Sequence, residues 1–120
     1  MSSPTQRSLK LMRERGFLCD VTEKWIPGAN IRKDLYGFID VLCVDDNLKS
    51  GKFDGATMGY KIVGVQSTSY SNVSARVKKI MESPNLPIVA GAGIMVVVHG
   101  WRKVKNRWVV KEVWLTEEGE

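Results

Sequence analysis

The fold of this chain is decided by residues 37–45, GFIDVLCVD, and residues 60–68, YKIVGVQST. Both stretches are apolar and rich in strand-forming residues, so they predict two buried strands joined by a polar connection. Asp40 interrupts the first stretch, and a carboxylate is costly to bury without a partner or a metal ion. In the second stretch, side chains alternate between faces, which puts Gln66 and Thr68 together. If the two strands pair, Asp40 and Gln66 bring oxygen ligands to one rim of the sheet, which predicts a site for a small hard cation.

The segments on either side of these strands predict the remaining elements of one domain. Ser3 and Pro4 can start a helix that runs to about Arg15, where Gly16 can end it. The other predicted elements are a strand at 17–25, a loop at 26–30, a long hairpin-type excursion at 45–59, a turn at 69–72, a helix at 73–81, a short helical turn at 85–90, strands at 94–100 and 108–115, and a short acidic tail at 116–120. This order predicts a single α/β domain over 1–120, with helices flanking a mixed sheet of about five strands.

The charge balance of the chain points to a polyanionic partner. The formal net charge is +5, from 18 Lys and Arg against 13 Asp and Glu, and Glu117, Glu118 and Glu120 are three of those acids. The rest of the chain is therefore strongly basic, which is typical of proteins that bind nucleic acid. Charge alone fits a basic soluble protein equally well. No apolar segment approaches the ~20 residues that span a bilayer, and no signal peptide is recognisable, so we expect a cytoplasmic protein without membrane contact.

Several chemistries are disfavoured by the residue inventory. Cys19 and Cys43 lack metal-site spacing and lie in apolar contexts, which predicts free buried thiols. The one histidine, His99, argues against a zinc site built on histidines and against a Cys–His nucleophile pair. The Gly-Ala-Gly at 91–93 lacks the Lys and Ser or Thr of a phosphate loop, so we expect a turn there and no nucleotide cofactor.

Two further groups of residues are candidates for the site. Glu23 is an acid among apolar neighbours in the predicted strand 17–25, where it is either a metal ligand or a surface edge residue. The candidate nucleic-acid contacts are basic residues before the central strand, on the second helix and along the last hairpin: Arg32, Lys33, Arg76, Lys78, Arg102, Lys103, Lys105 and Arg107. Trp101, Trp108 and Trp114 accompany the last group, and they can stack on bases or pack an edge of the sheet.

These motifs resemble those of a known family. Its pattern is similar to four segments of this chain: Arg13-Glu14-Arg15-Gly16-Phe17, Arg32-Lys33-Asp34, Ile39-Asp40-Val41-Leu42 and Val63-Gly64-Val65-Gln66-Ser67-Thr68. Together they resemble the PD-(D/E)XK nuclease superfamily, closest to its small Holliday-junction-resolvase-like members, over roughly residues 4 to 100. The resemblance implies a restriction-endonuclease-like αβββαβ core.

The resemblance also implies roles for individual residues. Asp40 matches the family's metal-binding aspartate, Gln66 its second acid, and Thr68 its lysine. An amide oxygen can still ligate a hard cation, but Thr68 lacks the positive charge that would stabilise a developing anion. Lys79 or Arg76 could supply that charge from the following helix, or Lys33 from the preceding loop. Further ligands for Mg²⁺ or Mn²⁺ would be the backbone oxygen of Ser67 and the carboxylate of Glu23.

Two functions follow from this resemblance. The first is an Mg²⁺-dependent DNA endonuclease, acting on branched DNA as a twofold dimer, either nucleoid-associated or virus-encoded and acting in the host cytoplasm. The second is a DNA-binding or accessory subunit that keeps the nuclease fold but lacks the chemistry. Asp40 within an apolar run favours the first, and Gln66 with Thr68 favours the second.

Overall fold

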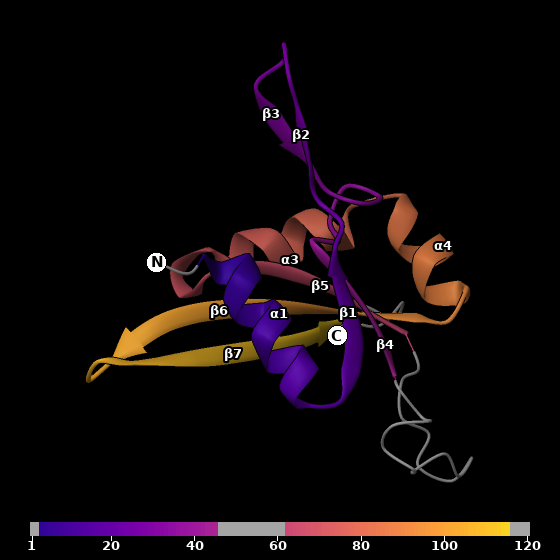
Figure 1. Cartoon of the computed structure of the whole chain (residues 1–120). Coiled ribbons are helices and arrows are strands. Elements are labelled where there is room, and N and C mark those ends of the chain that lie inside the picture. Colours follow the sequence, from indigo (N-terminus) through magenta and orange to yellow (C-terminus); the bar gives the residue numbers. More distant parts are fainter. Residues whose placement is uncertain (1–2, 46–61, 116–120) are drawn as a thin grey trace, which may run out of the picture.

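A mixed sheet with the strand order β1-β4-β5-β6-β7 forms the centre of the molecule (Figure 1). The computed structural model describes residues 3–45 and 62–115. Along the chain, the elements are α1 (Pro4–Glu14), β1 (Phe17–Val21), β2 (Lys24–Ile26), β3 (Ile31–Lys33), β4 (Val41–Asp45), β5 (Ile62–Ser69), the 3-10 helix η1 (Tyr70–Asn72), α3 (Val73–Met81), α4 (Asn85–Gly91), β6 (Ile94–Val104) and β7 (Arg107–Leu115). The predicted α/β class, with a five-stranded mixed sheet and flanking helices, is confirmed.

The central strand β5 joins the two halves of the sheet. It is antiparallel to β4, with Val41 opposite Val65, and parallel to β6, with Val65 opposite Val97. A parallel neighbour requires a crossover connection, which η1, α3 and α4 supply. Because β5 is covered on both faces, most of its residues are buried. The pairing of the two strands predicted from residues 37–45 and 60–68 is therefore confirmed within the described residues.

The helices cover opposite faces of the sheet. On one face, α1 packs through Leu9 and Met12 against a cluster that includes Val41, Val63 and Val65. On the other face, α3 and α4 pack against the sheet and the residues before β4, and together they form a second cluster: Phe38, Ile39, Val73, Ile80, Leu86, Val89, Val96, Val98 and Leu115. The predicted alternation along β5 is confirmed, since its valines at 63 and 65 face α1.

The ends of α1 follow the sequence signals. The hydroxyl of Ser3 accepts a hydrogen bond from the backbone N–H of Gln6 at 3.2 Å, as an N-cap residue does. After Arg15, the chain passes through Gly16 at a φ of +100°, a conformation that costs glycine little. The predicted helix boundaries are thus confirmed to within one residue.

The strand predicted at 17–25 is wrong, because two elements replace it. β1 ends at Val21, and after two residues the chain enters a separate two-stranded hairpin of β2 and β3, which projects from the body (Figure 1). Thr22 marks the break: its backbone N–H donates to the Asp40 carbonyl at 2.7 Å, and its hydroxyl donates to the Ile39 carbonyl at 2.7 Å. The predicted loop at 26–30 is the turn of this hairpin, where Gly28 and Asn30 have positive φ.

Other boundaries also differ from the predictions. The strand predicted to begin at residue 37 begins at Val41, after a tight turn. The strand predicted to end at residue 100 continues to Val104, so β6 and β7 form a long hairpin, and Lys105 and Asn106 in its turn have positive φ. The glycines at 91–93 lead from α4 into β6, as expected. Most of the predicted excursion at 45–59, and the acidic tail at 116–120, lie outside the described residues.

Cys19 and Cys43 are free and buried, as predicted. In the parts of the chain that the structure describes, no helix combines the length and apolar character needed to cross a membrane.

Candidate metal centre and nucleic-acid interface

A tight turn brings two acids together at the start of β4. Leu35 and Ile39 pair as an isolated antiparallel bridge through reciprocal backbone hydrogen bonds of 3.0 Å. Between them, the chain reverses at Tyr36 and Gly37, which have φ values of +56° and +89°. Asp34 directly precedes this bridge and Asp40 directly follows it, so their carboxylates are neighbours despite the turn between them.

Asp40 occupies a position where the ladder between β4 and β5 ends. Its backbone N–H still donates to the Val65 carbonyl at 2.8 Å. Its carboxylate then takes the place of the next strand residue, because Oδ2 accepts the backbone N–H of Ser67 at 2.8 Å. The same oxygen accepts Nε2 of Gln66 at 2.7 Å. The predicted proximity of Asp40 and Gln66 is therefore present, and both residues are buried.

Glu23 is the third acid of this cluster. The break after β1 turns it toward the start of β4, and one oxygen each from Glu23, Asp34 and Asp40 lie within 4.8 Å of one another. Glu23 also faces Arg32 at 3.5 Å. We call Glu23, Asp34 and Asp40 the acid cluster. Like-charged carboxylates at this separation repel one another unless protons or cations neutralise them.

The electrostatics of the acid cluster are dominated by burial. Burial, and after it the adjacent carboxyl of Asp34, raise the pKa of Asp40 to about 8, against the lowering effect of the hydrogen bonds from Ser67 and Gln66. A cation at the cluster would favour the ionised form, since opposite charge lowers the pKa of a carboxyl group.

Gln66 presents the less expected end of its amide to the cluster. Nε2 donates to Asp40 and lies 3.4 Å from Oδ2 of Asp34, whereas buried Oε1 has no hydrogen-bond partner among the described residues. Rotating the amide by half a turn would place Oε1 next to the two carboxylates. With a cation bound between them, Oε1 would be a ligand of the cation. Without a cation, it would be repelled by the carboxylate oxygens. The donor set would then consist of hard oxygen atoms, which Mg²⁺ and Mn²⁺ prefer. The residues present therefore fit a hard divalent cation.

A cleft of about 580 Å³ opens from the acid cluster and is basic on its other side. Its lining comes from the start of α1, from β3 and the residues that flank the β2–β3 hairpin, from the residue before β4, from the end of β5, from η1 and from α3: Ser3, Pro4, Thr5, Glu23, Arg32, Asp34, Asp40, Ser67, Thr68, Ser69, Asn72, Arg76 and Lys79. Thr68 is buried at the wall, and Arg76 and Lys79 reach the cleft from α3. Arg76 and Lys79 of α3 thus line the same cleft as Thr68. This is the arrangement that is needed if a helix residue is to supply the positive charge that Thr68 lacks.

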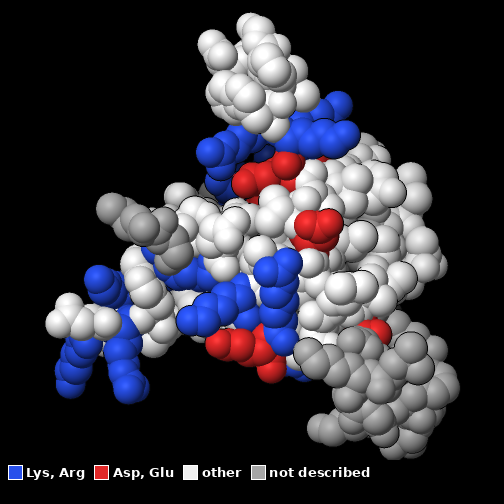
Figure 2. Space-filling view, in the orientation of Figure 1, with Lys and Arg blue, Asp and Glu red and all other residues white. Residues whose placement is uncertain are grey.

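The remaining predicted contacts lie farther out. Lys33 stands on the exposed strand β3, opposite Lys24, and Lys78 is exposed on α3. Arg102, Lys103, Lys105 and Arg107 are exposed along the β6–β7 hairpin. Figure 2 shows Lys and Arg side chains near the base of the β2–β3 hairpin and around the β6–β7 hairpin, with acidic side chains between them.

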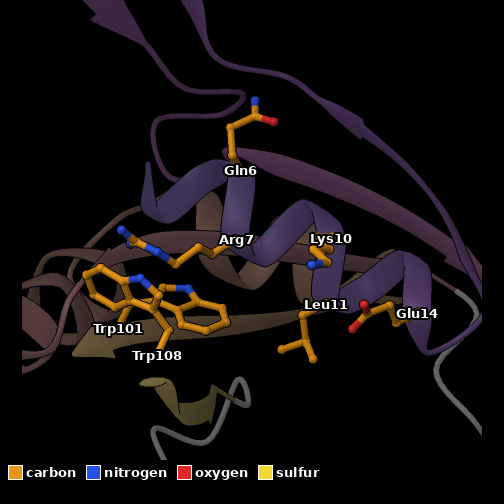
Figure 3. Close-up of a pocket in the computed structure, with 7 residues that line it drawn as sticks. All are labelled: Gln6, Arg7, Lys10, Leu11, Glu14, Trp101 and Trp108. Atoms are coloured by element: carbon orange, nitrogen blue, oxygen red, sulfur yellow. The ribbon is translucent and has the colours of Figure 1, made fainter. Parts of the chain in front are cut away.

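A second cleft of about 440 Å³ lies between α1 and the β6–β7 hairpin (Figure 3). Arg7 extends from α1 and stacks on the Trp108 ring, with its guanidinium carbon 3.3 Å from the ring centroid. Lys103 lies 5.6 Å from the same centroid. Trp101 is buried, and its indole N–H donates to the hydroxyl of Ser8 at 3.0 Å. Trp108 is therefore half-exposed beside basic side chains, whereas Trp101 packs within the fold.

A polar network inside the fold had no signal in the sequence. His99 Nδ1 lies 2.8 Å from the Ser8 hydroxyl, and His99 Nε2 lies 2.9 Å from a Glu112 oxygen, which Arg15 also contacts at 2.6 Å. Ser8 additionally lies 2.8 Å from the hydroxyl of Ser67. The order Ser, His, Glu resembles a nucleophile with its base and orienting acid. However, Ser8 and His99 have no exposed surface, so no substrate can reach the hydroxyl. We call Ser8, His99 and Glu112 the buried relay.

Comparison of the chain with protein-family models, with curated proteins and with solved structures found no match.

Proposed function

We propose that this protein is a divalent-metal-dependent DNA endonuclease of PD-(D/E)XK type. One observation carries the proposal: Glu23, Asp34 and Asp40 converge in a cleft that Arg76 and Lys79 line from another element. A cleft with clustered carboxylates beside fixed cations suits a phosphodiester, because a metal held by the acids and the basic side chains can both neutralise its charge.

The acid cluster would hold Mg²⁺ or Mn²⁺, with Gln66 as a further ligand after rotation of its amide and the Ser67 backbone oxygen as the family resemblance implies. A bound metal lowers the pKa of its water and polarises the scissile phosphate. Asp40 is kept in position by the backbone N–H of Ser67 on the rigid strand β5. Such preorganisation avoids reorganisation during the reaction.

The basic residues of the cleft would bind the substrate. Arg76 and Lys79 project from one face of α3, three residues apart, so both can meet the same phosphate or adjacent phosphates. Lys79 takes the role of the lysine that Thr68 replaces. The exposed Lys and Arg side chains of the two hairpins would bind the DNA backbone on either side of the cleft. Binding of DNA should therefore weaken steeply as the salt concentration rises. Branched DNA and a twofold dimer follow from the family resemblance alone.

The alternative function is DNA binding without cleavage. The observation that favours it is the pair of hydrogen bonds that Asp40 Oδ2 accepts from Gln66 and Ser67, because they satisfy this buried oxygen with protein donors. In that case, the carboxylate is a structural cap for the end of β5, and the chain is an accessory subunit.

Cleavage assays separate these two functions. Branched and linear DNA are incubated with Mg²⁺ or Mn²⁺ and with wild type, Asp34→Asn, Asp40→Asn or Asp20→Asn. The last variant makes the same chemical change at an exposed residue of β1, away from the cleft. We expect metal-dependent cleavage that both cluster variants abolish and Asp20→Asn retains. Binding without cleavage by any variant would support the accessory function.

A further inference from the structure

Two cysteines face each other across the pairing of β1 with β4. Cys19 and Cys43 are direct partners in its antiparallel register. Both are buried, and both belong to the cluster to which α1 contributes Leu9 and Met12. Their side chains therefore lie on the same face of the sheet, as those of directly opposite residues do.

The type of this pairing follows from a hydrogen bond farther along the same ladder. Thr22 is opposite Asp40 in the continued register, and its backbone N–H donates to the Asp40 carbonyl at 2.7 Å. Hydrogen-bonded and non-hydrogen-bonded pairs alternate along an antiparallel ladder, so Cys19 and Cys43, three positions away, form a non-hydrogen-bonded pair. The Cα atoms of such pairs are about 4.5 Å apart. Disulfides span Cα distances of roughly 4.4–6.8 Å, so the backbone already has the spacing that a disulfide needs.

The two thiols differ in their surroundings. Burial raises the pKa of Cys19, but contact with the Cys43 thiol and the positive charge of Arg13 lower it. Arg13 lies beside Cys19, because its guanidinium donates to the Cys19 carbonyl at 3.2 Å. Burial, and after it the neighbouring Cys19, raise the pKa of Cys43 well above its usual range. Cys19 also keeps 5% of its surface exposed, whereas Cys43 has none. Cys19 is therefore the thiol that an oxidant meets first, and Cys43 is placed to react with it.

The segment between the two cysteines carries the acid cluster. The chain leaves β1 after Val21, passes through the projecting β2–β3 hairpin and returns along β4 (Figure 1). Glu23, Asp34 and Asp40 all lie on this segment. A bond between the two cysteines would close the segment into a loop at the strands where it begins and ends.

We propose that Cys19 and Cys43 are an oxidation site, at which a peroxide converts the two thiols into a reversible disulfide that closes the loop of the acid cluster. The inference goes beyond the proposed function and does not depend on it. The Cys19 sulfur attacks the peroxide, so that an S–O bond forms, the O–O bond breaks and one molecule of water leaves. The Cys43 sulfur then attacks the sulfenic acid of Cys19, which forms the S–S bond and releases a second molecule of water. The two thiols lose two protons and two electrons to the peroxide, and a dithiol reductant returns them.

The disulfide and the fold should favour each other. A cross-link removes conformational freedom mainly from the unfolded chain, so it stabilises the folded one. By linkage, folding raises the equilibrium constant for forming the bond by the same factor. This reciprocity holds only where the folded backbone accepts the bond without distortion, which is what the register of β1 and β4 indicates.

Oxidation of the folded protein tests the inference. Wild type, Cys19→Ser and Cys43→Ser are treated with hydrogen peroxide without denaturant and then with N-ethylmaleimide in urea. Mass spectrometry of the intact chains and of unreduced peptides reports the products. We expect wild type to bind no maleimide, to yield the two cysteine peptides joined and lighter by two hydrogen atoms, and to recover both thiols with dithiothreitol. Each variant should keep one reactive thiol.

The two redox forms of wild type are then compared, which does not require that a variant folds. In glutathione buffers, the equilibrium constant for forming the disulfide should be on the order of 100-fold larger in folded protein than in concentrated urea. The oxidised form should need more urea to unfold than the reduced form. Amide hydrogen exchange of residues 17–24 should be slower in the oxidised form, because β1 can no longer separate from β4.

Reactive thiols that survive peroxide, added oxygen on either cysteine, or a bond to a second chain would overturn the inference. So would a disulfide that forms only in urea, that makes unfolding easier, or that leaves the exchange of residues 17–24 unchanged. The two proposals fail separately. If the disulfide forms as expected and neither redox form cuts DNA, the nuclease function fails and the inference stands. If wild type cuts DNA and its thiols never join, only the inference fails.

Discussion

The acid cluster and the buried relay place polar groups on either side of the same strand, with opposite consequences. Both contain buried carboxylate or imidazole groups and both contact Ser67, the first through its backbone N–H and the second through its hydroxyl. The relay is closed: His99 has a partner at each ring nitrogen, and neither Ser8 nor His99 reaches solvent. The acid cluster opens into a cleft, crowds three carboxylates, and leaves Oε1 of Gln66 without a partner among the described residues.

This contrast separates stability from function. A satisfied polar network in the interior fixes one packing arrangement, and removing a member leaves costly unpaired groups. An under-satisfied cluster that repels itself is held in place by the fold and gains when a ligand neutralises it. The two sites should therefore respond in opposite ways to the loss of one polar group.

The largest expected effect is on catalysis. Asp40→Asn should lower metal-dependent DNA cleavage by at least about 100-fold, since it removes a charged ligand from the acid cluster. The free energy of unfolding should stay equal or rise, because the amide is neutral beside Asp34 without having to take up a proton on folding, and it can still accept the Ser67 N–H. Single-turnover cleavage and urea unfolding give the two quantities. A large loss of stability with unchanged cleavage would reverse the assignment of the two sites.

The corresponding change in the buried relay should act on stability. His99→Ala leaves a cavity and removes the partner of Ser8 and Glu112, so we expect unfolding to become easier by about 3 kcal/mol. Cleavage per folded molecule, measured well below the lowered melting temperature, should be unchanged. Unaltered stability in urea would show that the relay contributes nothing to the fold.

The pH dependence of stability should carry opposite slopes from the two sites, measured with a chelator present. Burial lowers the pKa of His99 despite the nearby Glu112, and Arg15 lowers it further. The unfolded chain therefore binds the extra proton below about pH 6.5, and stability falls as pH falls, by up to about 1.4 kcal/mol per pH unit. His99→Gln should remove this slope.

Asp40 should act in the opposite direction. Its pKa is raised to about 8, so the folded state holds a proton that the unfolded state releases above about pH 4. Its contribution to stability is complete below that pH and is lost as pH rises toward 8. Urea unfolding of Asp40→Asn between pH 5 and 8 should therefore lack a decline that wild type shows. The same decline in both proteins would contradict the raised pKa.

The smallest expected effect is at the residue that touches both sites. Ser67→Ala removes only the hydroxyl contact with Ser8 and keeps the backbone N–H that Asp40 accepts. We expect a loss of about 1 kcal/mol in unfolding free energy and no change in cleavage. A cleavage defect larger than the stability loss explains would show that the hydroxyl helps to position Asp40.

Alternation and pairing allowed the sequence to predict that Asp40 and Gln66 meet, because both rules act over a few residues. Asp34 was not predicted as a ligand, since the turn at Tyr36 and Gly37 depends on backbone conformations that the apolar run 37–45 conceals. The buried relay could not be predicted, because Ser8 and His99 meet only through tertiary packing. The β2–β3 hairpin was missed because alternation continues across Thr22, where contacts to Ile39 and Asp40 end the strand.

The parallel pairing of β5 with β6 also bears on how the protein is made. During synthesis, β5 leaves the ribosome with β4 as its antiparallel neighbour, while its other edge has no strand to bond until the chain has been extended through β6. The nascent chain therefore carries an unpaired apolar edge for the interval needed to translate the α3–α4 crossover. A ribosome stalled within that crossover would expose an aggregation-prone intermediate. We therefore expect a chaperone to be most useful during this interval.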